Sequence, residues 1–128
     1  METYLIRLSE TPKKTLKTIP GFTLQKIVLS ENVLVDYDVM EPRRGTPIHR
    51  HPSEEIWFIV RGKGFIKVRG KRYEFEEHDF LYVPAGVEHQ LVNTGEGTLE
   101  YVAVLSPPME PSKDLIVVEE FSSEHLTG

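Results

Sequence analysis

The chain has 128 residues, the size of one ordinary domain, which is long enough to bury a core and too short for two. Its hydrophobic content of 39% and charged content of 27% are typical of a soluble globular protein, and its net charge of -5 weighs against nucleic acid as a partner. Cysteine is absent, which excludes disulfides and thiolate metal ligands. The chain has no stretch of roughly 18 apolar residues and no signal-peptide pattern at its start, so we expect no membrane partner and a cytoplasmic location.

The predicted elements are nearly all β-strands. Short apolar runs are separated by Gly, Pro, Asn and Ser, and no long stretch has the 3.6-residue period of a helix. Arg69 and Gly70 predict a tight hairpin turn. Many short strands with frequent turns favour a sandwich or barrel. The predicted strands, in chain order, are 3–8, 23–29, 32–40, 55–60, 64–68, 72–75, 79–84, 89–93 and 99–105.

The two ends are less regular. Residues 9–20 predict a loop, which leaves the strand Thr3 to Leu8 without a partner nearby in the sequence, so a second subunit could pair with it. Prolines in residues 106–112 are expected to prevent regular structure there. The apolar run at 115–121 is compatible with an added edge strand or with a cover for a barrel, and the sequence does not choose between them.

The most informative residues are His49, His51 and Glu55. Alternation along a strand turns the two histidines to the same side. Six residues of straight strand would carry Glu55 roughly 20 Å from His49, far beyond the reach of a shared metal. We therefore predict that the chain reverses at residues 52–54 and that the strands on either side are hairpin neighbours.

A fourth candidate ligand, His89, follows Pro84 and Gly86, which predict a bend before the next strand. Three imidazoles and one carboxylate form a mixed nitrogen and oxygen set. Such a set suits Mn, Fe, Ni, Zn, Co or Cu rather than calcium. Four protein ligands on a six-coordinate ion would leave two positions for water, dioxygen or a chelating substrate. Glu54 is the alternative carboxylate, since neighbouring strand residues face opposite ways and only one can point inward.

These residues resemble the two motifs of the cupin superfamily. The pattern HxHxxxExxxxxxG runs from His49 to Gly62, and PxGxxHxxxN runs from Pro84 to Asn93. The resemblance covers roughly residues 33–106 and implies one all-β cupin domain over 1–128. Its fold would be a double-stranded β-helix, or jelly-roll barrel, flanked by an N-terminal strand and a C-terminal extension. It also implies His49, His51, Glu55 and His89 as the ligands of one divalent transition metal.

Two positions depart from the cupin pattern. Gly45 lies three residues before His49 instead of five, and His78 occupies the place of the glycine expected before Pro84. The second departure is tolerable, because histidine is one of the non-glycine residues enriched at positive φ.

Candidate substrate-binding residues are Arg43, Arg44, Trp57 and Tyr101. The arginines precede the HxH strand and could hold a carboxylate or phosphate, although solvated loop arginines are the alternative. Trp57 shares the inward parity of Glu55 and is either a core residue or a stacking platform. Tyr101 could orient substrate or donate a proton, but parity alone does not settle which face it occupies.

The resemblance implies a metal-dependent enzyme acting on a small oxygen-rich or anionic substrate. Isomerases of the sugar-phosphate type, proteins like oxalate decarboxylase, and dioxygenases all share this pattern, and the fold does not choose among them. The alternative is a non-catalytic module that binds a metal or a small ligand. Cupin-like proteins are often dimers, so a homodimer is also expected.

Overall fold

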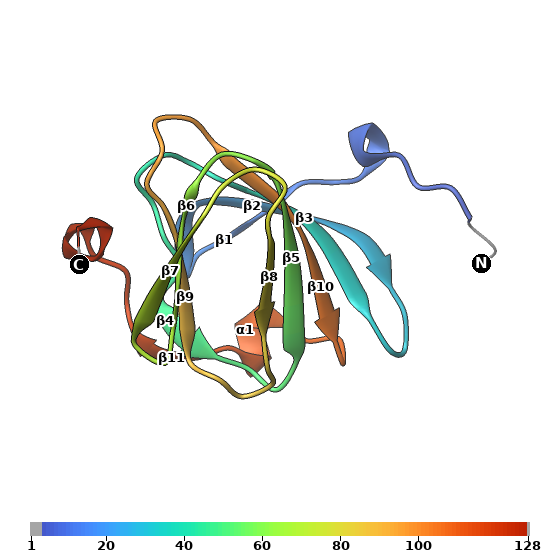
Figure 1. Ribbon diagram of the computed structural model, residues 1–128. Helices are drawn as coiled ribbons and strands as arrows, with labels where there is room; N and C mark the ends of the chain where they lie inside the picture. Colours follow the sequence, from blue (N-terminus) through green and yellow to red (C-terminus); the bar gives the residue numbers. More distant parts are fainter. Residues whose placement is uncertain (1–3, 128) are drawn as a thin grey trace.

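The computed structural model describes residues 4–127, which form two antiparallel β-sheets facing each other across a common interior (Figure 1). The first sheet has the strand order β1-β2-β3-β10-β5-β8, with bounds Lys14–Leu16, Ile19–Leu29, Leu34–Met40, Leu99–Ser106, Glu54–Arg61 and Phe80–Val83. The second has the order β11-β4-β9-β6-β7, with bounds Ile116–Glu119, Ile48–Arg50, His89–Asn93, Gly64–Val68 and Lys71–Phe75. This arrangement confirms the predicted all-β jelly-roll fold.

Local turn chemistry explains several connections. Arg69 and Gly70 both have positive φ, 51° and 80°, as the tight hairpin between β6 and β7 requires. His78, at the position where the cupin pattern has glycine, also has positive φ, at 73°. Gly62 lies between β5 and β6 with φ of 97°, and an added Cβ would lie 2.8 Å from the carbonyl oxygen of Thr98. The motif glycine is therefore fixed by both conformation and space.

The predicted hairpin between the HxH strand and the strand of Glu55 is wrong. β4 pairs with β9 and β11, whereas β5 pairs with β10 and β8, so the two strands belong to opposite sheets. The chain does turn at residues 51–53, but it crosses from one sheet to the other there. Side chains that face inward from opposite sheets can meet without any hydrogen bonding between their strands. Glu55 consequently approaches the histidines across the interior.

The prediction for the N-terminal region is also wrong over the described part. Residues 4–7 have no regular structure, the 3-10 helix η1 (Leu8–Glu10) follows, and Thr3 lies outside the described residues. The supposed loop 9–20 contains β1 and the start of β2, because a tight turn pairs these strands within the first sheet. Gln25 donates hydrogen bonds from Nε2 to the carbonyl oxygens of Leu8 and Thr11, both at 2.9 Å, and so holds the base of the N-terminal arm.

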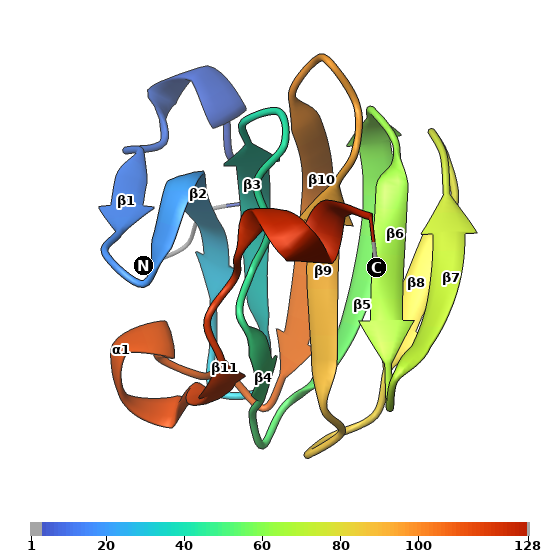
Figure 2. The ribbon, with the colours of Figure 1, turned by 90° about the vertical axis from the view of Figure 1, so that its left-hand side faces the viewer.

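The C-terminal region closes one side of the barrel. The short helix α1 (Pro111–Asp114) forms despite the nearby prolines, because proline is tolerated at the first helical position. β11 then adds to β4 as an edge strand, which decides between the two possibilities left open by the sequence. After it, Phe121 packs over Gly45, where an added Cβ would lie 2.6 Å from the ring, and η2 (Ser123–Leu126) lies over the second sheet (Figure 2).

Inward-facing side chains of both sheets form one hydrophobic core beside a polar cluster. The core includes Phe22, Leu34, Met40, Trp57 and Leu99, all of them buried. Within residues 4–127, no helix is both long enough and apolar enough to cross a membrane.

Candidate metal centre

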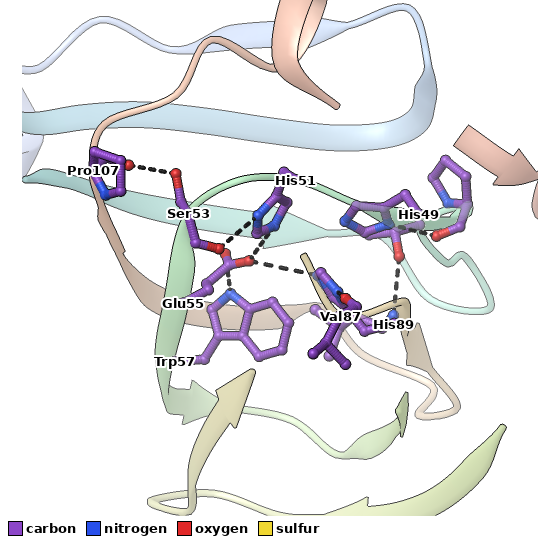
Figure 3. Close-up of polar contacts among 11 residues, drawn as sticks. His49, His51, Ser53, Glu55, Trp57, Val87, His89 and Pro107 are labelled. Carbon is purple, nitrogen blue, oxygen red and sulfur yellow. Dashed lines mark hydrogen bonds and ion pairs between the residues drawn. The ribbon is translucent and has the colours of Figure 1, made fainter. Parts of the chain in front are cut away.

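Three histidines lie together inside the barrel. His49 on β4 and His89 on β9 are directly opposite each other in the second sheet, and His51 follows the end of β4 at the corner leading to β5. All three are buried, and each offers one ring nitrogen within 4.8 Å of those of the other two (Figure 3). The structure therefore brings the three predicted histidines to one point.

The backbone fixes the orientation of each ring. The Nδ1 atom of every histidine faces a carbonyl oxygen two residues away: His49 that of Pro47 at 2.7 Å, His51 that of Ser53 at 2.9 Å, and His89 that of Val87 at 2.8 Å. A carbonyl only accepts, so Nδ1 carries the proton in each ring. The Nε2 atoms are therefore the ones that could coordinate a metal, and a ring held through Nδ1 is the arrangement that supports metal-ligating histidines.

Glu55 completes the cluster from β5. Its Oε1 atom lies 3.0 Å from His51 Nε2 and 3.7 Å from His89 Nε2. Its Oε2 atom accepts a hydrogen bond of 2.6 Å from the indole Nε1 of Trp57. The indole thus holds one carboxylate oxygen and leaves the other facing the imidazoles. Glu54 instead points to solvent, where it accepts a hydrogen bond from the hydroxyl of Tyr82.

Burial and proximity shift the pKa values of these groups in different directions. Burial and the charge of His89 lower the pKa of His49 to about 4. Burial also acts to lower the pKa of His51, but the hydrogen bond and charge of Glu55 outweigh it and raise the value. Burial would raise the pKa of Glu55, yet the hydrogen bond with His51 and the proximity of His89 lower it to about 2. Without a metal, His51 and Glu55 therefore form a buried ion pair, and a metal ion would replace the proton on His51 Nε2.

The donor set fits a transition-metal ion. His89 Nε2 is one of three buried side-chain atoms in the described chain that lack a hydrogen-bond partner, the others being Asp36 Oδ1 and Asp38 Oδ1. An unpartnered, unprotonated nitrogen beside two further imidazoles and a carboxylate oxygen is a ready ligand. His49, His51 and His89 could hold the ion, with Glu55 Oε1 as the fourth donor.

A cavity of about 60 Å³, counted over the positions that a water-sized sphere can occupy, opens beside this cluster. One water requires roughly 10–15 Å³ on this measure, so the cavity has room for several waters or a small ligand. Its polar lining includes His49, His51 and Glu55 together with Asp36 and Asp38. Segments near both ends of the described chain supply the apolar lining of the cavity. The residues are Leu16 of β1, Ile19, Phe22 and Leu24 of β2, and Met109 and Leu115 near the C-terminus.

Asp36 and Asp38 are functional candidates that sequence reasoning missed. Both lie on β3 and face inward between Leu34 and Met40, with 6% and 5% exposure. Asp38 is hydrogen-bonded to Tyr101, its cross-strand partner on β10. The available signal was the presence of two aspartates, a residue type depleted in strands, at alternate positions of an otherwise apolar run.

Of the four predicted substrate-binding residues, two line the cavity and two do not. Trp57 and Tyr101 are buried and line the cavity. Arg43 and Arg44 are exposed and are not among its lining residues. The carbonyl of Arg44 accepts a hydrogen bond from the N–H of Asn93, at the opposite end of β9 from His89. The arginines are thus separated from the cavity by the length of a strand.

Comparisons with known proteins agree with this architecture. The sequence profile described as "Cupin domain" matches residues 37–105. Auxin-binding protein T85 of Nicotiana tabacum is 33% identical over 122 residues, covering 87% of this chain and 62% of that protein. The 5-aminosalicylate 1,2-dioxygenase of a Comamonas species is 29% identical over 83 residues, covering 62% of this chain and 22% of the enzyme.

Similarity in structure extends further than similarity in sequence. The polyketide cyclase RemF from Streptomyces resistomycificus superimposes with a TM-score of 0.77 at 15% identity, covering 95% of this chain and 89% of that one. The chain spans less than two thirds of the length of the curated relatives described above. Because the family profile covers more than half of its residues and the fold agrees, this chain belongs to the cupin family.

Proposed function

We propose that this chain is an enzyme that uses one divalent transition metal to transform a small molecule inside the barrel. The proposed ligands are the Nε2 atoms of His49, His51 and His89 and the Oε1 atom of Glu55. The observation that carries the proposal is the convergence of these four atoms beside a cavity that Asp36 and Asp38 also line. A mixed nitrogen and oxygen set of this kind favours Mn, Fe, Co, Ni, Cu or Zn over calcium.

The chain contributes orientation, exclusion of water and groups that exchange protons. A bound ion would supply Lewis acidity and, if redox-active, chemistry with dioxygen. Trp57 holds Glu55 in place through its indole N–H, and the Nδ1–H groups fix the imidazole rings. Tyr101, Asp36 and Asp38 provide hydroxyl and carboxyl groups that could exchange protons with a ligand in the cavity.

We infer a reaction of the dioxygenase or decarboxylase type in preference to isomerisation of a sugar phosphate. No lysine or arginine is among the described residues that line the cavity, so a phosphate would find no cationic side chain there. One relative is named as a dioxygenase. The second candidate function is non-catalytic ligand binding, which the name of the tobacco auxin-binding protein favours. The titratable groups in the cavity support an enzyme, because a simple metal-holding module does not need them.

Elemental analysis of untagged protein purified without chelators tests this proposal. We expect about one equivalent of a transition metal per chain. Iron or copper would direct the next assay to oxygen consumption with small phenols and hydroxy acids. Manganese would direct it to carbon dioxide release from small carboxylic acids. Absence of bound metal, even after reconstitution, would contradict the proposed enzyme and favour the binding module.

We further propose that the chain is a homodimer, and we keep the cytoplasm as its predicted location. The outer face of the first sheet carries an apolar row in which Tyr37, Val102, Phe58 and Phe80 are successive cross-strand neighbours. Phe80 is 71% exposed. The arm at residues 4–8 runs away from the barrel in Figure 1 and exposes Tyr4 and Leu5. Exposed apolar surface of this kind marks interaction sites, and a second copy could cover both features.

Light scattering on the purified chain tests the dimer. We expect twice the mass of 14.7 kDa for the wild type and a single mass for Phe80→Glu, which places a charge in the proposed interface. Glu74→Gln, at an exposed position on β7, is a control that should leave the mass unchanged. A wild-type monomer at tens of micromolar would contradict the proposal.

A further inference from the structure

We propose that Asp36, Asp38 and Tyr101 form a second recognition site in the cavity, which binds a hydroxyl or ammonium group of the ligand. The ligand's other end would bind at the metal centre, so the inference rests on the proposed function for that end. The structure thereby assigns a class of ligand: a compact, largely apolar molecule with an oxygen donor at one end and a hydrogen-bond donor at the other.

The register of the first sheet positions this site. Asp36 on β3, Ala103 on β10 and Trp57 on β5 are successive cross-strand neighbours, and all three face inward. Adjacent strands lie about 4.8 Å apart, so β3 and β5 are separated by roughly 10 Å. Ala103 has the smallest side chain of the three, which leaves space between Asp36 and the indole that holds Glu55. A compact molecule can occupy this space.

The acceptor atoms of the site are not satisfied by the protein. Asp36 Oδ1 and Asp38 Oδ1 are buried and have no hydrogen-bond partner, although both residues line the cavity. Unpaired buried acceptors are costly, and they are relieved by a group that donates hydrogen bonds. Tyr101 donates to Asp38 and fixes the position of that carboxyl group. The unsatisfied oxygens therefore indicate the chemistry of the missing partner.

The charges around the pair favour a donor over an anion. Glu55 and Glu110 act on Asp36 with like charge, whereas Lys26, its cross-strand neighbour on β2, acts with opposite charge. Lys26 Nζ also lies 3.4 Å from Glu110 Oε2, so its charge is shared. Burial, followed by the charge of Glu55, raises the pKa of Asp36 to about 7. A cationic or hydroxyl donor would stabilise the carboxylate, while an anionic group at this position would be repelled.

The remaining walls define the body of the ligand. Leu24, Phe22, Leu105, Met109 and Leu115 line the cavity with apolar surface. Pockets of this composition bind molecules through apolar contact and use a few polar groups to set orientation. The body of the ligand is therefore apolar.

Calorimetric titration of the metal-loaded chain tests the proposal. The probes are benzoate and its hydroxy and aminomethyl derivatives, each substituted at ring position 3 or 4. All share a metal-binding carboxylate, and they differ only in the donor. We expect the best donor-bearing probe to bind about tenfold tighter than benzoate, the size expected of a hydrogen bond to a charged group. The hydroxyl and ammonium series separate the two kinds of donor.

Substitutions identify the site responsible. In Asp36→Asn and Asp38→Asn, the advantage of the ammonium probe over benzoate, with both affinities measured in the same variant, should fall below about threefold. Glu74→Gln removes an exposed carboxylate and should keep the full advantage. The preference of the wild-type chain for donor-bearing probes over benzoate is measured without any variant. The inference can therefore still be tested if a variant does not fold.

Two results would overturn the inference. One is equal or weaker binding of every donor-bearing probe relative to benzoate, including failure of all probes to bind. The other is an unchanged ammonium advantage in both aspartate variants. If benzoate binding requires metal but the donors add nothing, the metal site stands and this inference fails. If the donors gain affinity through Asp36 and Asp38 in a chain that holds no metal, the inference stands and the proposed function fails.

Discussion

Two polar groups lie in the interior of the barrel, and the protein holds them in different ways. In the histidine cluster, every Nδ1 is held by a backbone carbonyl, and Trp57 holds Glu55, so the free atoms point to one place. In the aspartate pair, Asp36 Oδ1 and Asp38 Oδ1 have no partner. The fixed geometry of the cluster supports the proposed metal ion, whereas the unsatisfied oxygens of the pair support the proposed donor group of a ligand.

Among the predicted changes, the removal of one histidine should have the largest effect, because it lowers the metal affinity of the histidine cluster. His89→Ala takes away the buried ligand opposite His49, so metal affinity should fall at least about 100-fold. Metal content after dialysis gives the result. His78→Asn changes an exposed histidine whose positive φ asparagine tolerates, and it should keep the metal. Equal metal content in His89→Ala and wild type would contradict the ligand set.

Acid should weaken metal binding, because imidazole must lose its Nε2 proton before it coordinates. The interaction with Glu55 raises the pKa of His51, so affinity should fall at least about tenfold for each pH unit below that pKa. His49, with its pKa lowered to about 4, should contribute a second proton only near that pH. Competition with a metal-sensitive dye across this pH range measures the slope. An affinity independent of pH would contradict these ligands.

Trp57→Phe tests the support of the cluster without touching a ligand. The change removes the indole N–H that holds Glu55 Oε2, so metal affinity should fall about tenfold. Phe58→Leu, on the outer face of the same strand, is a matched aromatic control and should have little effect. Competition with a chelator measures both. An unchanged affinity in Trp57→Phe would mean that the hydrogen bond does not position the carboxylate.

The last prediction concerns the stability of the fold, which the aspartate pair lowers, and does not concern metal binding. The folded chain holds the proton of Asp36 to higher pH than the unfolded chain, so stability falls as pH rises from 3.8 to about 7. Asp36→Asn removes that loss and should raise the free energy of unfolding by about 1–3 kcal/mol at pH 8, with almost no gain at pH 4. Thermal melts of metal-free protein at both pH values test this. Equal melting temperatures at pH 8 would show that the carboxylate is satisfied.

The contrast also explains what could be predicted from the sequence. His49, His51, Glu55 and His89 could be selected because each stands in a short motif of specific spacing, HxHxxxExxxxxxG or PxGxxHxxxN. The pairing of the strands that carry these residues could be predicted only in part, since the same spacing allows a hairpin or a crossing between sheets. The crossing is decided by which strands pair with β4 and β5, and those partners lie far away in the chain.

Asp36 and Asp38 were not predicted as site residues, because the alternation of side chains along β3 does not show which face is buried. Val35, Tyr37 and Val39 are apolar side chains of β3 that face outward, whereas the aspartates face inward with Leu34 and Met40. A pattern of alternating residues predicts a strand but does not say which face is buried when both faces carry apolar residues. The N-terminal prediction failed for a related reason. A local apolar run at 4–8 has strand propensity but no partner, whereas the charged segment at 14–16 pairs with β2.

Titration of the metal-free chain with cobalt(II), followed by tryptophan fluorescence, tests the metal centre most directly. Trp57 is the only tryptophan in the sequence, its indole is hydrogen-bonded to Glu55, and its ring centre lies 5.7 Å from that of His89. A metal in the cluster should quench its emission, with an end point at one equivalent, and His89→Ala should lose that end point. Emission that stays constant while cobalt binds, or an end point that survives in His89→Ala, would contradict the metal centre described above.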